Sequence, residues 1–139
     1  MTVCNVLLVD DEIEFVTSLA ERLRLRGFSA TTASSGQAAL DILGREFFHV
    51  VVLDVKMPGM DGLETLKTIK SRHPPTEVIL LTGHACLDAA VNGIQADAFD
   101  YLVKPADLDE LSFKIQDAFE KSCLNPKNEP VCYTQITNH

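Results

Sequence analysis

Short, continuous apolar runs alternate along this chain with segments in which apolar residues recur every three or four positions. The runs lie at 6–9, 50–53, 78–81 and 101–103. Continuous apolar runs of this length are typical of strands buried on both faces, as in a parallel sheet. Residues 28–33 form a shorter, threonine-rich segment, which favours a strand at the sheet edge. The pattern therefore predicts five strands.

The segments between and after these strands have the spacing of amphipathic helices. Arginines followed by Gly27 mark the end of the first helix. Ser34 or Ser35 can cap the second helix, and Asp107 with Glu110 resembles a capping pair at the start of the last. The predicted apolar faces are Ile13, Val16, Ala20 and Leu23; Ala39, Leu43 and Phe47; Leu63, Leu66 and Ile69; Ala90, Val91 and Ile94; and Leu108, Leu111, Ile115 and Phe119.

Five strand–helix units are too few to close the eight-stranded α/β barrel, so the alternation predicts an open, doubly wound parallel sheet with helices on both faces. In such sheets ligands bind beyond the carboxyl ends of the strands, where the strand order reverses. With the order 2-1-3-4-5, that point lies between the first and third strands. We assign residues 1–122 to this domain and residues 123–139 to a C-terminal tail or the start of a linker.

Composition and charge narrow the classes of partner. The 139 residues predict one domain, and 20 acidic against 12 basic side chains give a net charge of −8. This balance argues against nucleic acid or anionic membrane as a direct partner. The four cysteines form no C-x-x-C pair, and His49, His73 and His139 have no metal-ligand spacing. No signal peptide or membrane span is evident, so we expect a cytoplasmic protein with free thiols.

Chemically versatile side chains follow four of the predicted strands. They are Asp10 with Asp11, Asp54, Thr82 and Lys104. Because the carboxyl ends of parallel strands share one edge of a sheet, these side chains should meet in one pocket. Their oxygens can bind a hard divalent cation, and the set can surround a phosphoryl group with a nucleophile, a donor and a positive charge. The pattern predicts phosphoryl transfer onto an aspartate.

Each of these residues also has a simpler interpretation when it is taken alone. Asp11 could cap the first helix, and Asp54 could be a turn residue. Thr82 could be an ordinary strand-end threonine, Tyr101 a core residue and Pro105 part of a turn. Their occurrence together at successive strand ends is what favours a site.

Four motifs in order resemble the receiver domain of two-component response regulators. They are LVDDE at 8–12, DVKMPGMDG at 54–62, LTGH at 81–84 and AFDYLVKP at 98–105. The similarity runs from about Asn5 to Lys121. It implies a flavodoxin-like receiver fold and a stoichiometric phosphoacceptor in place of a turnover enzyme.

The resemblance also implies roles for individual residues. Asp54 would accept a phosphoryl group from a histidine kinase or a histidine phosphotransfer protein. Asp11, Asp54 and the backbone carbonyl of Lys56 would coordinate Mg²⁺, with Mn²⁺ as an alternative ion. Asp10 would contact the ion through water.

Phosphorylation in this family is read out by a conformational switch. The resemblance implies that Thr82 and Lys104 contact the phosphoryl oxygens. Thr82 would then move and Tyr101 turn inward, reshaping the face of the fourth helix, fifth strand and fifth helix. It also implies a cis Lys104–Pro105 bond. A phosphorylation-dependent homodimer is one form that the response could take.

Positions two residues beyond the phosphoacceptor and two beyond the threonine border the site in this family. Here they are Lys56 and His84, and we hypothesise that they set the lifetime of the phosphoryl group. The sequence departs from the family at Asp97, where many relatives carry glycine; aspartate tolerates left-handed backbone better than most residues.

The sequence leaves open how the predicted receiver passes on its signal. No helix-turn-helix, ATPase or catalytic segment follows the predicted receiver, so the receiver would act by docking, or the chain would be the N-terminal receiver of a larger DNA-binding transcriptional regulator. A haloacid dehalogenase-like phosphohydrolase is less favoured, because such enzymes need a second aspartate where Lys56 stands. A phosphorylation-independent docking module is disfavoured because the acidic set is complete.

Overall fold

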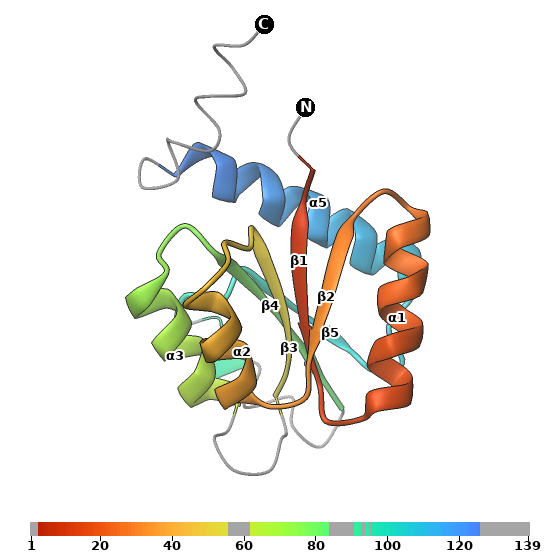
Figure 1. Cartoon of the computed structure of the whole chain (residues 1–139), viewed down its shortest axis with the longest axis horizontal. Helices are drawn as coiled ribbons and strands as arrows, with labels where there is room; N and C mark the ends of the chain where they lie inside the picture. Colours follow the sequence, from red (N-terminus) through yellow and green to blue (C-terminus); the bar gives the residue numbers. More distant parts are fainter. Residues whose placement is uncertain (1–2, 56–61, 84–90, 93, 95, 126–139) are drawn as a thin grey trace, which may run out of the picture.

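A five-stranded parallel sheet with helices on both faces forms the protein (Figure 1). The computed structural model describes residues 3–55, 62–83, 91–92, 94 and 96–125. The strands are β1 (Asn5–Val9), β2 (Ser29–Ala33), β3 (Val50–Asp54), β4 (Glu77–Thr82) and β5 (Asp100–Val103). The helices are α1 (Ile13–Leu25), α2 (Gly36–Leu43), α3 (Gly62–Arg72) and α5 (Leu108–Leu124).

The strand order is β2-β1-β3-β4-β5, as the sequence predicts. β3 and β4 are buried along their whole length, which explains their continuous apolar runs. The edge strand β2 is only partly buried, in keeping with its threonines. Order reverses beside β1, so the ends of β1 and β3 border the position where ligands bind in such sheets.

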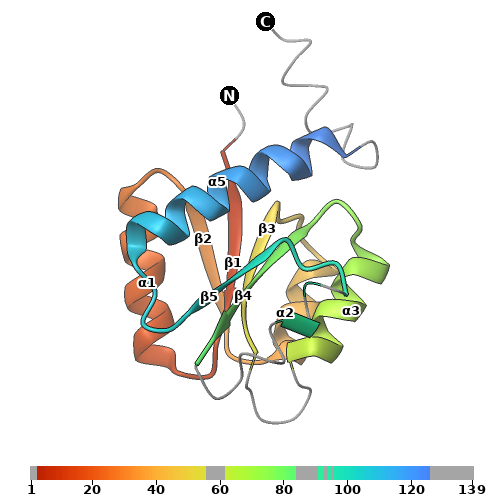
Figure 2. The same ribbon diagram turned by 180° about the vertical axis from the view of Figure 1, so that it is seen from behind.

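Side chains that alternate along the strands build two core layers. Leu7 and Val9 of β1 face the layer shared with α2 and α3, whereas Val6 and Leu8 face the layer shared with α1 and α5. Figure 2 shows α5 crossing the sheet on the same side as α1. Helices therefore cover both faces of the sheet, and the candidate site residues Asp10, Asp11 and Asp54 lie at its carboxyl edge.

Local signals in the sequence place the helix ends. Ser35 accepts a hydrogen bond from the Ala38 N–H at the start of α2, and Asp107 accepts one from the Glu110 N–H at the start of α5. Gly27 has a φ of 94° after α1, where glycine avoids the steric cost of a Cβ. Both caps and the glycine turn agree with the predictions.

Two predictions fall at the limits of the described residues. Residues 91, 92 and 94 are helical, and the rest of the predicted fourth helix lies outside the described residues. The last helix ends at Leu124, two residues past the domain boundary expected at 122.

Asp97 has a φ of 76°, the left-handed conformation considered for it. Across the described ranges, no helix has the length and apolar character needed to cross a membrane.

Candidate functional site

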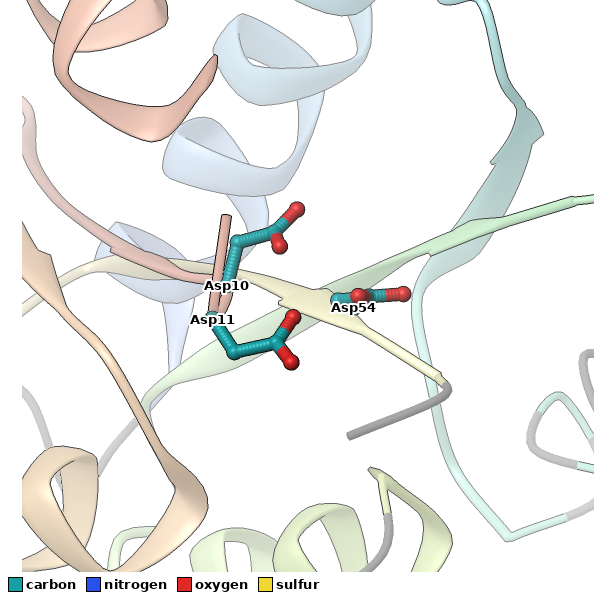
Figure 3. Close-up of side chains that lie close together, drawn as sticks. All are labelled: Asp10, Asp11 and Asp54. Carbon is teal, nitrogen blue, oxygen red and sulfur yellow. The ribbon is translucent and has the colours of Figure 1, made fainter. Parts of the chain in front are cut away.

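Three carboxylates meet where β1 and β3 end (Figure 3). Asp10 and Asp11 directly follow β1, and Asp54 is the last residue of β3. The pairing of Val9 with Leu53 brings the two strand ends level. One carboxylate oxygen from each residue lies within 4.8 Å of the other two. We call Asp10, Asp11 and Asp54 the acidic site.

Burial differs among the three residues. Asp10 is 2% exposed and Asp54 is 6% exposed, whereas Asp11 is open to solvent. The Asp10 N–H donates to the Ala33 carbonyl at 3.0 Å, and its Oδ1 accepts from the Glu12 N–H at 2.9 Å. These bonds fix Asp10 between the end of β2 and the start of α1.

The simpler interpretation of Asp11, as a helix cap, is wrong. Glu12 occupies the N-cap position of α1, and its side chain makes no capping hydrogen bond. Asp11 therefore stands before the helix with its carboxylate close to those of Asp10 and Asp54. Its position is better explained by the acidic site than by helix capping.

Lys104 brings a positive charge to these carboxylates. Its Nζ donates to Asp10 Oδ2 at 2.9 Å and lies 3.7 Å from Asp54 Oδ2 and 3.6 Å from Glu12 Oε1. Burial lowers the pKa of Lys104, but the hydrogen bond to Asp10 and the charges of Asp54, Asp10 and Glu12 outweigh it, so the pKa is raised. The ammonium group is therefore held in its charged form.

Thr82 and Tyr101 lie on the neighbouring strands. Thr82 ends β4, is completely buried and donates through Oγ1 to the Gly83 carbonyl at 3.0 Å. Its own carbonyl accepts from the Lys104 N–H at 2.7 Å, which joins the ends of β4 and β5. Tyr101 is half-buried in β5 and packs against the core layer of α2 and α3. The Lys104–Pro105 peptide bond is cis.

Gly62 has a spatial role that turn chemistry alone does not reveal. Its N–H donates to the Val55 carbonyl at 3.1 Å. A Cβ at this position would lie 2.7 Å from the Val55 Cα and 2.9 Å from the Asp54 carbonyl oxygen. Glycine therefore lets α3 begin directly against the end of β3, beside Asp54.

Sequence reasoning missed two residues near Lys104. Glu12 extends the acidic pair and could have been noticed as a third consecutive acid. Phe15 has its ring centroid 4.9 Å from Lys104 Nζ, and no spacing rule connects residues so far apart in the chain. Lys56 and His84, which were predicted to border the site, lie outside the described residues.

The donor set fits a hard divalent cation. Carboxylate oxygens are the ligands that Mg²⁺ and related ions prefer, and three of them lie together here. Lys104 offsets only part of this negative charge, since Glu12 adds a further carboxylate. The carboxyl edge therefore offers oxygen ligands to a divalent cation, and the Lys104 ammonium group offers a positive charge to an anionic group bound by that cation.

The strand order, with acidic residues at the carboxyl edge of the sheet, is that of flavodoxin-like α/β domains, and comparison with known proteins specifies the family. The family model described as response regulator receiver domain matches residues 6–116. The chain belongs to this family.

Curated relatives are longer than this chain. It is 43% identical over 126 residues to the DNA-binding transcriptional regulator NtrC of Klebsiella pneumoniae, covering 89% of this chain and 27% of that protein. It is 40% identical over 121 residues to the regulatory protein AtoC of Escherichia coli, covering 86% and 26%. The chain thus spans about a quarter of the length of these relatives.

Solved structures share the fold. A response regulator receiver domain protein from Clostridium thermocellum superposes with a TM-score of 0.84 at 35% identity, covering 88% of this chain and 98% of that chain. NtrX from Brucella abortus gives a TM-score of 0.83 at 32% identity, covering 88% of this chain and 28% of that chain. One receiver domain therefore accounts for most of this sequence.

Proposed function

We propose that Asp54 accepts a phosphoryl group from a histidine kinase or a histidine phosphotransfer protein. The observation that carries this proposal is the gathering of three carboxylates beside the Lys104 ammonium group at the carboxyl edge of the sheet. A carboxylate oxygen of Asp54 would form the new bond to phosphorus. The bond between phosphorus and the donor nitrogen would break, and that nitrogen would keep the electron pair.

Asp11 and Asp54, with the backbone carbonyl of Lys56, would hold Mg²⁺ or Mn²⁺, and Asp10 would contact the ion through water. A bound divalent cation reduces the repulsion between a carboxylate and the oxygens of an incoming phosphoryl group. The closeness of the three carboxylates supports this assignment. Asp10, which is fixed by its bonds at the start of α1, would orient the ion's water ligand.

Lys104 and Thr82 would bind the transferred group. Lys104 is already charged and within 3.7 Å of Asp54, so it can pair with a phosphoryl oxygen without taking up a proton. Thr82 Oγ1 donates to the Gly83 carbonyl, and it would have to leave that acceptor to donate to a phosphoryl oxygen. This change of hydrogen-bond partner would move Thr82 and with it the end of β4.

The response to phosphorylation would pass through Thr82 and Tyr101. A phosphoryl group adds about −1.5 to −2 charge, enough to bias a surface that has two arrangements. Movement of Thr82 would free space behind it, and the half-buried Tyr101 would turn inward. The face that includes β5 and α5 would change and so control a partner, an output domain or a homodimer.

The relatives suggest where the signal goes. NtrC of Klebsiella pneumoniae is named a DNA-binding transcriptional regulator, and this chain matches about a quarter of it. We therefore favour an output domain or partner that acts on transcription. Residues 123–139 would then serve as the tail or linker. The acidic receiver would not itself bind DNA, and the exchange would occur in the cytoplasm, which suits the free thiol of Cys4.

The experiment is phosphorylation of the purified chain with acetyl phosphate and Mg²⁺, followed by intact mass measurement. One added phosphoryl group is expected, and it should be absent with Asp54→Asn and with EDTA. A dephosphorylation time course on Lys56→Ala and His84→Ala tests whether these residues set the lifetime; unchanged rates would reject that role.

Two other outcomes would point elsewhere. No adduct, together with no Mg²⁺ binding, would identify a phosphorylation-independent docking module. Sustained hydrolysis of assorted phosphomonoesters would identify a phosphohydrolase instead of a stoichiometric acceptor.

A further inference from the structure

The Lys104 ammonium group touches an aromatic ring as well as carboxylates. Its Nζ lies 4.9 Å from the centroid of Phe15, a distance at which the face of an aromatic ring attracts a cation. Phe15 is in the first turn of α1, which begins at Ile13 just after the acidic pair. The turn that follows Asp10 and Asp11 therefore also reaches the lysine that comes from the end of β5.

The ring differs in kind from the other partners of Lys104. Asp10, Asp54 and Glu12 attract the ammonium group through negative charge. A divalent cation or a phosphoryl group at the acidic site would weaken or redirect these ion pairs. The ring carries no net charge, so its attraction for Lys104 persists through those changes.

Lysine needs such an anchor because its stem is long and flexible. Several rotatable bonds separate Nζ from the backbone, and fixing them costs conformational entropy. Phe15 is half-buried and packs against the core layer of α1 and α5, so its position is set by the fold. A fixed ring beside a flexible cation restricts where that cation can go.

We propose that Phe15 is a positioning residue that holds the Lys104 ammonium group beside Asp54 during phosphoryl transfer. This rests on the proposed function of Asp54 as phosphoacceptor. Phe15 touches neither the phosphoryl group nor a metal in this scheme. It acts through Lys104 by limiting the positions that Nζ can occupy when its carboxylate partners change.

The surroundings of Phe15 make it suitable for substitution. The ring lines a groove of about 470 Å³ between α1 and the start of α5, together with Leu19, Ala106 and Leu108. A shorter side chain at a groove wall leaves a smaller packing defect than one in a sealed core. Phe15→Leu removes the aromatic face, and Phe15→Tyr keeps it.

The chain offers a matched control at the other edge of the sheet. Lys121 Nζ lies 5.7 Å from the centroid of the Phe99 ring, and this lysine pairs with Glu77 at the start of β4. Phe99→Leu therefore removes a comparable contact between a ring and a lysine at a distance from the acidic site.

The decisive experiment is a double-mutant cycle on the rate of phosphorylation by acetyl phosphate with Mg²⁺. Phe15→Leu should slow the reaction about fivefold, the rate equivalent of a cation–π contact of ordinary strength. Phe15→Tyr should restore the rate, and Phe99→Leu should leave it unchanged. In a Lys104→Met background, Phe15→Leu should have no further effect, because the residue on which Phe15 acts is gone.

Nuclear magnetic resonance supplies a readout that does not depend on phosphorylation. The Lys104 Hε protons should show an upfield ring-current shift in the wild type and in Phe15→Tyr, and lose it in Phe15→Leu. An unchanged rate in Phe15→Leu would overturn the proposal, as would an equal slowing in the Lys104→Met background. If the wild type takes up no phosphoryl group, the proposed function fails, and a missing ring-current shift would then reject the contact itself.

Discussion

The two edges of the sheet both hold buried charged groups, but they balance those charges in opposite ways. At the amino edge, Glu77 is 2% exposed and lies 3.5 Å from Lys70 and 3.6 Å from Lys121. At the carboxyl edge, Asp10, Asp54 and Glu12 share the ion pairs of Lys104, and Asp11 lies beside Asp10 and Asp54. Among the residues that the structure describes, the amino edge has two cations around one carboxylate, and the carboxyl edge has one cation for four carboxylates.

We interpret the amino edge, where cations balance the buried carboxylate, as structural, and the carboxyl edge, with its surplus of carboxylates, as functional. At the amino edge the charge of the buried Glu77 carboxylate is offset within the protein by Lys70 and Lys121, although Glu77 Oε1 and His49 Nε2 make no hydrogen bond to any described residue. Carboxylates that outnumber the cations beside them repel one another, and this repulsion lowers the stability of the fold. Such a surplus is expected where a divalent cation or a reacting group is to bind.

His49 makes the amino edge sensitive to acid. It is 1% exposed, its Nδ1 accepts from the Asn5 N–H at 3.1 Å, and its ring lies against those of Phe47 and Phe119. Burial lowers the pKa of His49 from 6.5 to about 4. Between these values the unfolded chain binds a proton that the folded protein does not, so the free energy of unfolding should fall as the pH falls.

The expected loss is about 3 kcal/mol between pH 6.5 and pH 4, the largest effect predicted here. Urea denaturation at a series of pH values measures it. This fall in the free energy of unfolding should be missing in His49→Gln. His73→Gln, which replaces a partly exposed histidine, should remove much less of it. An identical pH dependence in wild type and His49→Gln would contradict the burial argument.

Overpacking tests the carboxyl edge. Gly62→Ala should lower the free energy of unfolding by about 2 to 3 kcal/mol, because the new methyl group would press on the backbone of Asp54 and Val55. It should also slow phosphorylation of Asp54 by moving the end of β3. Thermal unfolding and the acetyl phosphate assay measure the two effects. Gly44→Ala, whose Cβ would meet no atom closer than 3.5 Å, is the matched control.

Removing one lysine tests the charge balance of the amino edge. Lys70→Met should cost about 2 kcal/mol, because Glu77 would lose one of its cations and the carbonyls of Pro74 and Thr76 would lose a donor. Lys121→Met should cost less than about 1 kcal/mol, since the Lys121 side chain is 61% exposed. Urea denaturation of both variants measures the difference, and equal costs would show that burial does not distinguish the two lysines.

Removing one carboxylate should have the opposite sign at the carboxyl edge. Asp11→Asn should raise the free energy of unfolding by about 0.5 kcal/mol in EDTA, because it relieves repulsion at an exposed position. The same variant should weaken Mg²⁺ binding, measured by titration calorimetry. A destabilised Asp11→Asn protein in EDTA would show that the carboxyl edge is balanced after all, and the contrast between the edges would fail.

Much of the fold could be predicted from the sequence because its signals are local. The apolar run at 50–53 identified a strand buried on both faces, and Ser35 and Asp107 identified helix starts. The acidic pair and Asp54 could be placed together because parallel strands end on one edge, whatever the details of packing. Topology alone was enough to assemble the acidic site.

The remaining features depend on contacts that no local pattern encodes. Phe15 occupies an ordinary position on the apolar face of α1, and only the approach of β5 to that helix puts Lys104 over its ring. His49 has no distinctive spacing, and its burial results from the packing of α5 across the sheet. The sequence alone determined the strands, the helix caps and the carboxylates of the site. Tertiary structure decided which cation balances which carboxylate, because a charge acts on what lies within a few ångströms of it, regardless of distance along the chain.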